Sequence, residues 1–214
     1  MRTAIDRLVY IEAKGIRLEG MLGVPENAIG VVLFAHGSGS SRLSPRNQFV
    51  AKYLRSEGLG TLLIDLLEPE EAEDRSKVFN ITLLADRLKI ATDWLQKNDS
   101  TADLQIGYFG ASTGAAAALM AAADRPEIGA VVSRGGRPDL AMKSLPLVKS
   151  PTLLIVGGMD VPVIQMNREA YDMLGGQKQM IIVPGATHLF EEPGTLEEVA
   201  RLAAEWFGRY LESE

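Results

Sequence analysis

Residues 110–114, Gly-Ala-Ser-Thr-Gly, decide the fold of this 214-residue sequence. The residues before them, 104–109, form a mostly apolar run of strand length, and residues 115–123 are a run of alanine, leucine and methionine that predicts a buried helix. Glycines on both sides of the serine permit a tight strand-to-helix turn, because larger side chains there would collide with neighbouring backbone. The pattern predicts that the Ser112 side chain projects into a site.

A second interpretation of the turn is that Ser112 only caps the helix, since serine is a favoured N-cap residue and glycine suits turns in any α/β protein. The two interpretations differ in whether Ser112 has chemical partners elsewhere. A serine hydroxyl is a weak nucleophile until a base removes its proton. A catalytic Ser112 therefore requires a histidine on another loop.

Strand patterns alternate with helical patterns along most of the chain. Strands are predicted at residues 8–13, 16–24, 29–35, 59–66, 103–109, 129–133, 151–156 and 178–183. Helices are predicted between Ser44 and Gly58, over 83–95, 112–123 and 163–174, and after a capping box formed by Thr195 and Glu198. The alternation predicts one α/β domain over residues 1–214, with a mostly parallel sheet covered by helices on both faces.

Ligands of such sheets bind beyond the carboxyl ends of the strands, so the candidate base is sought on those loops. The chain has two histidines, His36 after the third strand and His188 after the last. A loop histidine taken alone is as often a structural or surface residue. Only His188 follows Ser112 in the order nucleophile, acid, histidine, and it is predicted to be the base. Asp160, after the strand at 151–156, is predicted to orient it.

Four other carboxylates are weaker candidates for the acid. Asp139 follows a proline in a loop, and Asp172 falls on the outward face of a predicted helix. Glu191 and Glu192 lie so close to His188 in sequence that solvated side chains are expected. The acidic segment 68–74 is likewise interpreted as solvated surface.

Acyl transfer also needs hydrogen-bond donors for the oxyanion, and the backbone amides of Ser38 and Thr113 are predicted to supply them. Glycines on both sides of Ser38 let its amide turn inward without steric cost. A nucleotide loop is disfavoured, because residues 36–42 lack the P-loop lysine and have Arg42 where a dinucleotide fingerprint has glycine.

Arg134 and Arg137 follow the strand at 129–133 and are tentative substrate-binding residues, suited to a carboxylate or phosphate. The alternative is a pair of surface arginines without a role in binding.

Composition excludes several classes of partner. The formal net charge of −6 disfavours nucleic acid and anionic lipid surfaces, so a small molecule is the expected partner. The absence of cysteine excludes thiolate nucleophiles and thiolate zinc sites. The apolar run at 115–123 is far shorter than the roughly 20 residues of a membrane span, and no signal-peptide pattern opens the sequence, so a cytoplasmic location is expected.

Four segments in this order resemble the α/β-hydrolase superfamily, in particular its dienelactone-hydrolase-like branch: 36–42, 110–114, 158–160 and 187–188. The resemblance implies a three-layer sandwich of eight strands, the second antiparallel, without a metal or organic cofactor. Dienelactone hydrolases proper use cysteine where this chain has Ser112, so dienelactone itself is not predicted as substrate. The connection at 134–150 is too short for a lipase lid, so no lid domain and an open, shallow site are expected.

These observations predict a serine hydrolase that cleaves a small ester, thioester or lactone through an acyl-enzyme on Ser112. An acyltransferase or a peptidase could use the same three residues. The alternative from another class is a non-catalytic small-molecule binding protein on the same fold.

Overall fold

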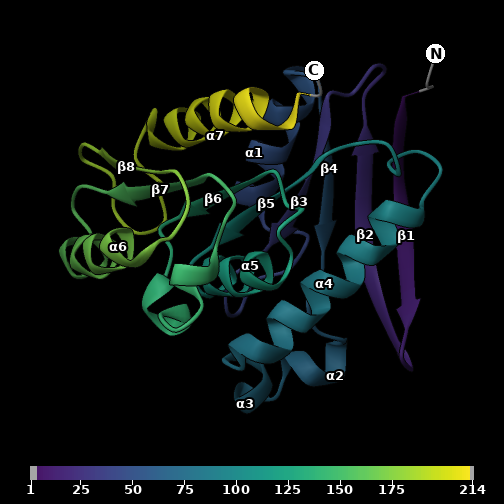
Figure 1. Ribbon diagram of the computed structural model, residues 1–214, viewed down its shortest axis with the longest axis horizontal. Coiled ribbons are helices and arrows are strands. Elements are labelled where there is room, and N and C mark those ends of the chain that lie inside the picture. Colours follow the sequence, from purple (N-terminus) through teal and green to yellow (C-terminus); the bar gives the residue numbers. More distant parts are fainter. Residues whose placement is uncertain (1–3, 213–214) are drawn as a thin grey trace.

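One eight-stranded sheet organises residues 4–212, the part of the chain that the computed structural model describes (Figure 1). The strands are β1 (Ile5–Ala13), β2 (Ile16–Val24), β3 (Gly30–Ala35), β4 (Leu59–Ile64), β5 (Ile106–Ala111), β6 (Ala130–Arg134), β7 (Thr152–Gly157) and β8 (Lys178–Val183). Their order in the sheet is β1-β2-β4-β3-β5-β6-β7-β8. Strand β2 is antiparallel to both of its neighbours and every other pair is parallel, which confirms the predicted sheet.

Helices cover both faces of the sheet and enclose a separate apolar core on each (Figure 1). One face carries α1 (Pro45–Ser56) and α7 (Thr195–Leu211); the other carries α4 (Ile81–Lys97), α5 (Thr113–Asp124) and α6 (Val161–Met173). The β4–α4 connection contains two short helices, α2 (Pro69–Ala72) and α3 (Arg75–Val78). The β6–β7 connection contains two 3-10 helices, η1 (Pro138–Ala141) and η2 (Leu145–Leu147).

Most predicted strands agree with the observed ones to within three residues, and the differences have local causes. Strand β4 ends at Ile64 rather than Leu66, because the Asp65 carboxylate turns toward the β3 loop and accepts a hydrogen bond from the Arg42 amide at 2.7 Å. Strand β5 begins at Ile106 rather than Asp103, because the amide of Leu104 closes a turn by donating to Thr101 O at 2.9 Å.

The predicted capping box at α7 is wrong. Gly194 is the N-cap, with a φ of 83° that suits glycine. The Thr195 hydroxyl donates instead to the carbonyl of Glu192 at 2.8 Å, and the Glu198 carboxylate pairs with Arg201 at 2.7 Å. The sequence has the capping-box residues, but both of their side chains bind other partners.

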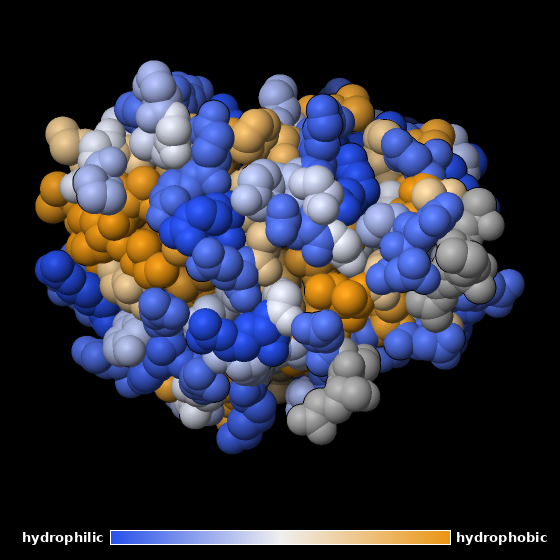
Figure 2. Space-filling view, turned by 90° about the horizontal axis from the view of Figure 1, so that it is seen from above, coloured by the Kyte–Doolittle hydropathy of each residue, from blue (hydrophilic) through white to orange (hydrophobic). Residues whose placement is uncertain are grey.

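Two observations concern membrane helices and the polarity of the surface. Among the helices of residues 4–212, none is long and apolar enough to span a bilayer. Figure 2 shows polar residues over much of one face, with apolar residues gathered toward the end of the molecule where β8 lies in Figure 1.

Candidate active site

Ser112 lies where β5 passes into α5, in a backbone conformation that serine rarely adopts. Its φ is 51° and its ψ is −121°, and such strained positions in non-glycine residues are found mainly at functional sites. Ser112 stands at the N-cap position, but its hydroxyl makes no capping hydrogen bond. The interpretation of Ser112 as a simple helix cap is therefore wrong.

The flanking glycines are required by close backbone contacts. A Cβ on Gly110 would lie 2.4 Å from the Cα of Ala115, and a Cβ on Gly114 would lie 2.2 Å from the carbonyl oxygen of Ala35. Neither neighbour is a flexible side chain that could move away. The predicted steric reason for the two glycines is confirmed.

His188 and Asp160 meet although 28 positions separate them in sequence. The Nδ1 atom of His188 lies 2.6 Å from Oδ2 of Asp160, and the Asp160 side chain is only 13% exposed. Asp160 precedes α6 but does not cap it, so its carboxylate is available to the ring. A hydrogen bond donated by Nδ1 leaves Nε2 of the ring as the basic atom.

The loop that carries His188 is held by contacts that the sequence did not reveal. The amide of Met159 donates to Ala186 O at 2.9 Å, which joins the exits of β7 and β8. Phe190 has a φ of 55° and is only 1% exposed, so its ring anchors the loop in the core. The carboxylate of Glu192 accepts from the amide and the hydroxyl of Thr187, at 3.1 and 2.6 Å.

The described residues show no hydrogen bond between the Ser112 hydroxyl and Nε2 of His188. The two residues still approach the same loop: a Cβ on Gly135 would lie 3.6 Å from Cε1 of His188, and the Ser112 amide donates to Arg134 O at 3.2 Å. Catalytic hydrogen bonds are often long in ligand-free enzymes and shorten when substrate binds.

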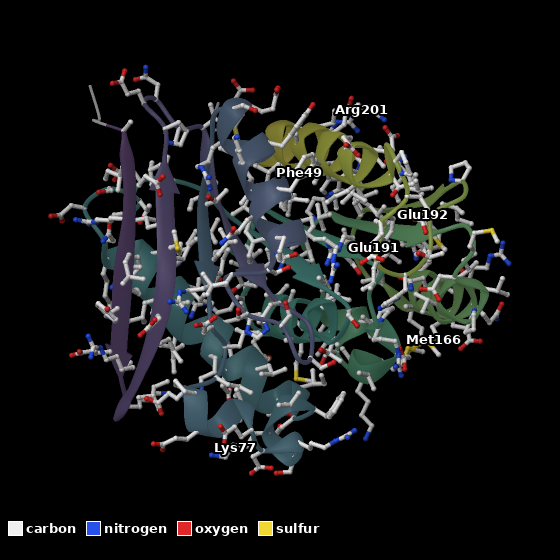
Figure 3. The ribbon with its side chains drawn as sticks, turned by 180° about the vertical axis from the view of Figure 1, so that it is seen from behind. Phe49, Lys77, Met166, Glu191, Glu192 and Arg201 are labelled. Atoms are coloured by element: carbon white, nitrogen blue, oxygen red, sulfur yellow. The ribbon has the colours of Figure 1, made fainter. Side chains whose placement is uncertain are left out.

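The competing carboxylates have other partners or positions. Asp139 accepts two hydrogen bonds from Arg137, at 2.9 and 2.8 Å, and Asp172 is exposed on α6. Glu191 pairs with Arg46 at 3.2 Å, and its side chain is 63% exposed, so it is solvated as expected. Figure 3 shows Glu191 and Glu192 together on the loop after β8. Asp160 is the carboxylate placed against His188.

The candidate oxyanion donors lie side by side. The amide of Ser38 donates to Oγ1 of Thr113 at 2.9 Å, and the amide of Thr113, at the first position of α5, has no partner within the described structure. The positive end of the α5 dipole lies at the same point. A substrate oxygen at this position would compete with Thr113 Oγ1 for the Ser38 amide.

His36 has a structural role. Its Nδ1 lies 2.9 Å from Gly37 O, and its Nε2 accepts from the Leu66 amide at 3.0 Å, so the ring joins the β3 and β4 exits as a neutral imidazole. Burial lowers the pKa of His36 below 6.5, against the opposing effects of the Gly37 carbonyl and the Asp65 charge. Both ring nitrogens of His36 thus have backbone partners, so His188 is the remaining candidate base.

The two tentative binding arginines lie in different environments. Arg137 is bound by Asp139, and this hydrogen bonding raises the pKa of Arg137. Arg134 is only 7% exposed, and its Nη1 is buried without a partner. Burial, reinforced by the nearby charge of Arg46, lowers the pKa of Arg134 to about 10. The surface-pair interpretation is wrong for Arg134.

A cavity of about 600 Å³ opens beside the candidate oxyanion loop. Residues 36–42 form one side of it, and the β4 exit with α2 and α3 forms the other. This cavity was not predicted from the sequence, because the acidic segment 68–74 was interpreted as solvated surface. In the structure Glu71 of that segment has a side chain only 13% exposed and pairs with Arg87 at 2.9 Å. Within residues 4–212, no cluster of three or more acidic or histidine side chains could hold a metal ion.

Three comparisons place the chain among known proteins. A model of the dienelactone hydrolase family matches residues 18–212. The crystal structure of a dienelactone hydrolase from Anabaena variabilis has a TM-score of 0.94 and 57% identity, and covers 98% of this chain and 100% of its own. Est1E from Butyrivibrio proteoclasticus has a TM-score of 0.81 at 17% identity, with 94% and 98% covered, which shows likeness of fold alone.

A curated relative from Mycobacterium tuberculosis carries a different name. The protein named "Putative phosphoribosyl transferase" is 58% identical over 207 residues, which are 96% of this chain but 47% of that protein. The chain therefore spans about half the length of the curated relatives that it matches.

Proposed function

Because the chain belongs to the dienelactone hydrolase family and has its α/β-hydrolase fold, we propose that it is a serine hydrolase that cleaves a small ester, thioester or lactone. The observation that carries the proposal is the backbone of Ser112, held at a φ of 51° with a hydroxyl that caps no helix. A strained serine at the tip of a strand-to-helix turn is the arrangement of a nucleophile.

The proposed reaction proceeds in two steps. Ser112 Oγ attacks the substrate carbonyl while Nε2 of His188 takes the hydroxyl proton, and the oxyanion is stabilised by the amides of Ser38 and Thr113. His188 then gives the proton to the leaving oxygen or sulfur, and the acyl group stays on Ser112. A water molecule then attacks the acyl carbon and gives a proton to Nε2 of His188; the bond from the acyl carbon to Ser112 Oγ breaks, His188 returns that proton to Oγ, and the free acid leaves. Asp160 stabilises the imidazolium in both steps.

Arg134 is proposed to bind an anionic group of the substrate, and Arg137 is not. A buried guanidinium without a carboxylate partner is unfavourable until an anion reaches it. Arg134 ends the strand next to the Ser112 turn, since Ala111 and Arg134 are paired in the register of β5 and β6. Arg137 already has Asp139 as its counter-ion.

The nucleophile is tested with p-nitrophenyl esters of acids from acetate to decanoate. Ser112→Ala is expected to reduce kcat/KM by on the order of 10⁴-fold or more, with unchanged circular dichroism. Retained turnover in Ser112→Ala would refute the proposal. Labelling by a fluorophosphonate probe without ester turnover would indicate a narrow substrate range. The absence of both labelling and turnover would favour the binding-protein alternative. Transfer of the acyl group to an added alcohol would identify an acyltransferase.

The anion site is tested with p-nitrophenyl acetate and the monoanionic p-nitrophenyl hydrogen succinate. Arg134→Met is expected to lower the ratio of kcat/KM for the anionic over the neutral ester by about tenfold, because a charge-assisted hydrogen bond contributes about 1.5–3 kcal/mol. Arg168→Met, an exposed arginine on α6, is the matched control for the loss of one charge. An unchanged ratio in Arg134→Met would exclude the anion site.

We propose that the transferase activity named for the mycobacterial relatives belongs to the part of those proteins that this chain does not match. The matched region is the one that the dienelactone hydrolase family model covers. The cytoplasmic location, the single domain, the absence of a lid and the exclusion of nucleic acid and membrane partners stay predictions.

A further inference from the structure

The cavity of about 600 Å³ lies beside the candidate active site, and the proposed reaction does not yet use it. Its inner surface is apolar. Leu67 and Leu84 are 7% and 3% exposed and form the inner part, and the two short helices contribute side chains from the outer part. The apolar lining residues are Leu67, Pro69, Ala72, Val78 and Leu84.

The cavity lies next to the candidate reacting centre. Gly37 and Ser38 line it, and both belong to the candidate oxyanion loop. A Cβ on Gly37 would lie only 3.1 Å from the Cβ of Ser112, so this loop separates the nucleophile from the cavity by the width of a backbone. A carbonyl oxygen bound at the Ser38 amide would therefore lie beside the cavity, within reach of one substituent of the carbonyl carbon.

The rim is polar, and both of its arginines already have carboxylate partners. Arg42 binds the carboxylates of Asp65 and Glu19, the latter at 2.7 Å, and the Arg17 guanidinium lies 3.7 Å from Glu12. An anionic group that enters the rim would have to compete with one of these carboxylates. A neutral group could use the serine hydroxyls of residues 40 and 41 and the paired charges as hydrogen-bond partners.

The outer wall is held in place before any ligand binds. Glu71 of α2 pairs with Arg87 of α4 at 2.9 Å and with Lys77 of α3 at 3.3 Å, and Arg87 is only 6% exposed. Figure 3 shows Lys77 near this end of the molecule. A preformed pocket binds without the cost of ordering its walls. Pockets of roughly 300–1,000 Å³ hold drug-sized ligands, and a cavity of about 150 Å³ already accepts benzene.

We propose that this cavity receives the larger of the two groups on the ester carbonyl, an uncharged apolar group of aromatic-ring size or more whose polar end reaches the rim. The inference rests on the proposed hydrolase function and names its substrate class. It replaces the expected shallow site with a defined pocket, in which Val78 limits the size of the group that fits. Val78 is half-buried at the end of α3, between the rim and the core.

The test compares methyl acetate with two ring-bearing esters, methyl 3-phenylpropanoate and phenethyl acetate, by pH-stat titration. Val78→Phe is expected to lower the kcat/KM ratio of one ring-bearing ester over methyl acetate by about tenfold, because it fills the space of the ring. Val78→Ala is expected to preserve or raise that ratio. Which ester responds identifies the group in the cavity as acyl or alkoxy.

Thr82→Phe is the matched control, because threonine has nearly the shape of valine and Thr82 is exposed on α4 outside the cavity. It should leave both kcat/KM ratios unchanged. Urea unfolding of Val78→Phe establishes that the variant is folded. Equal effects of Val78→Phe on methyl acetate and on both ring-bearing esters, or no effect on any ratio, would overturn the proposal.

A binding measurement separates this proposal from the hydrolase function. Saturation-transfer NMR with 3-phenylpropanamide, an uncharged analogue, should show binding to the wild type and to Ser112→Ala but not to Val78→Phe. If no ester is hydrolysed and this pattern is still observed, the cavity assignment stands while the hydrolase function fails. If the wild type does not bind the amide, the cavity assignment fails.

Discussion

At the scale of single residues, the candidate site depends on backbone strain that is stored at two positions. Ser112 has a φ of 51° and Phe190 a φ of 55°, both in the region that favours glycine. Strain of this kind persists only where the surrounding structure compensates for it, and it costs about 1–3 kcal/mol at each position. Phe190 is compensated by burial of its ring. Ser112 has no comparable burial, and its proposed role as nucleophile would account for the strain there.

Because the backbone at Ser112 is strained, replacing this serine by glycine is expected to stabilise the protein. Ser112→Gly should raise the free energy of unfolding by about 1 kcal/mol, because glycine adopts this conformation without steric cost. Ser112→Ala should bring no such gain, because alanine keeps a Cβ. Both variants should be inactive. Urea unfolding of the three proteins measures the difference, and equal stability of the glycine and alanine variants would show that the turn is not strained.

At the scale of elements, α7 packs against glycines on the sheet. A Cβ on Gly107 of β5 would lie 2.7 Å from the Phe207 ring, and a Cβ on Gly30 of β3 would lie 2.6 Å from Leu211. The side chains of Phe207 and Leu211 are both fully buried in the core on this face. The helix therefore approaches the sheet closely enough that a single methyl group must displace it. The sequence predicted a helix here, but not the depth of its contact with the sheet.

Gly107→Ala is expected to lower the free energy of unfolding by about 1–3 kcal/mol, since overpacking a filled core forces side chains out of their preferred rotamers. Gly208→Ala is the control, because no atom lies within 4 Å of a Cβ at this exposed side of α7 and alanine is the better helix former. Chemical denaturation followed by tryptophan fluorescence compares the two. A Gly107→Ala variant as stable as the wild type would mean that α7 can shift without cost.

At the scale of the whole molecule, the parallel strands bring all candidate catalytic loops to one edge of the sheet (Figure 1). His36 joins two of these loops and stays neutral in the folded protein. Its pKa is lowered chiefly by burial, so the unfolded chain binds a proton at higher pH than the folded one does. Stability is therefore complete above the ordinary pKa of 6.5 and falls as the pH drops from there toward the lowered pKa.

This linkage predicts a loss of stability in mild acid that depends on His36. Urea midpoints of the wild type should fall between pH 7 and pH 5, and His36→Gln should show a shallower fall, because glutamine can accept the Leu66 amide without titrating. His188 and the carboxylates are present in both proteins, so the difference in slope isolates His36. Identical slopes in the two proteins would remove His36 as the cause.

The sequence alone determined those features that depend on neighbours along the chain. Alternating apolar patterns predicted the eight strands, and the glycines around Ser112 predicted the tight turn, because both follow from local geometry. The order of Ser112, Asp160 and His188 indicated one candidate triad among several carboxylates. The capping-box pattern at the start of α7 failed because neighbouring residues offered other partners: the Thr195 hydroxyl donates to the Glu192 carbonyl, and the Glu198 carboxylate pairs with Arg201.

Only the tertiary structure decided which groups meet across the loops. The contact of Asp160 with His188 and the cavity next to Ser38 both depend on distances between loops that are far apart in sequence. Burial also changes the chemistry of a side chain, as it does for Arg134, and burial is a property of the folded molecule. Local sequence carries no measure of either quantity.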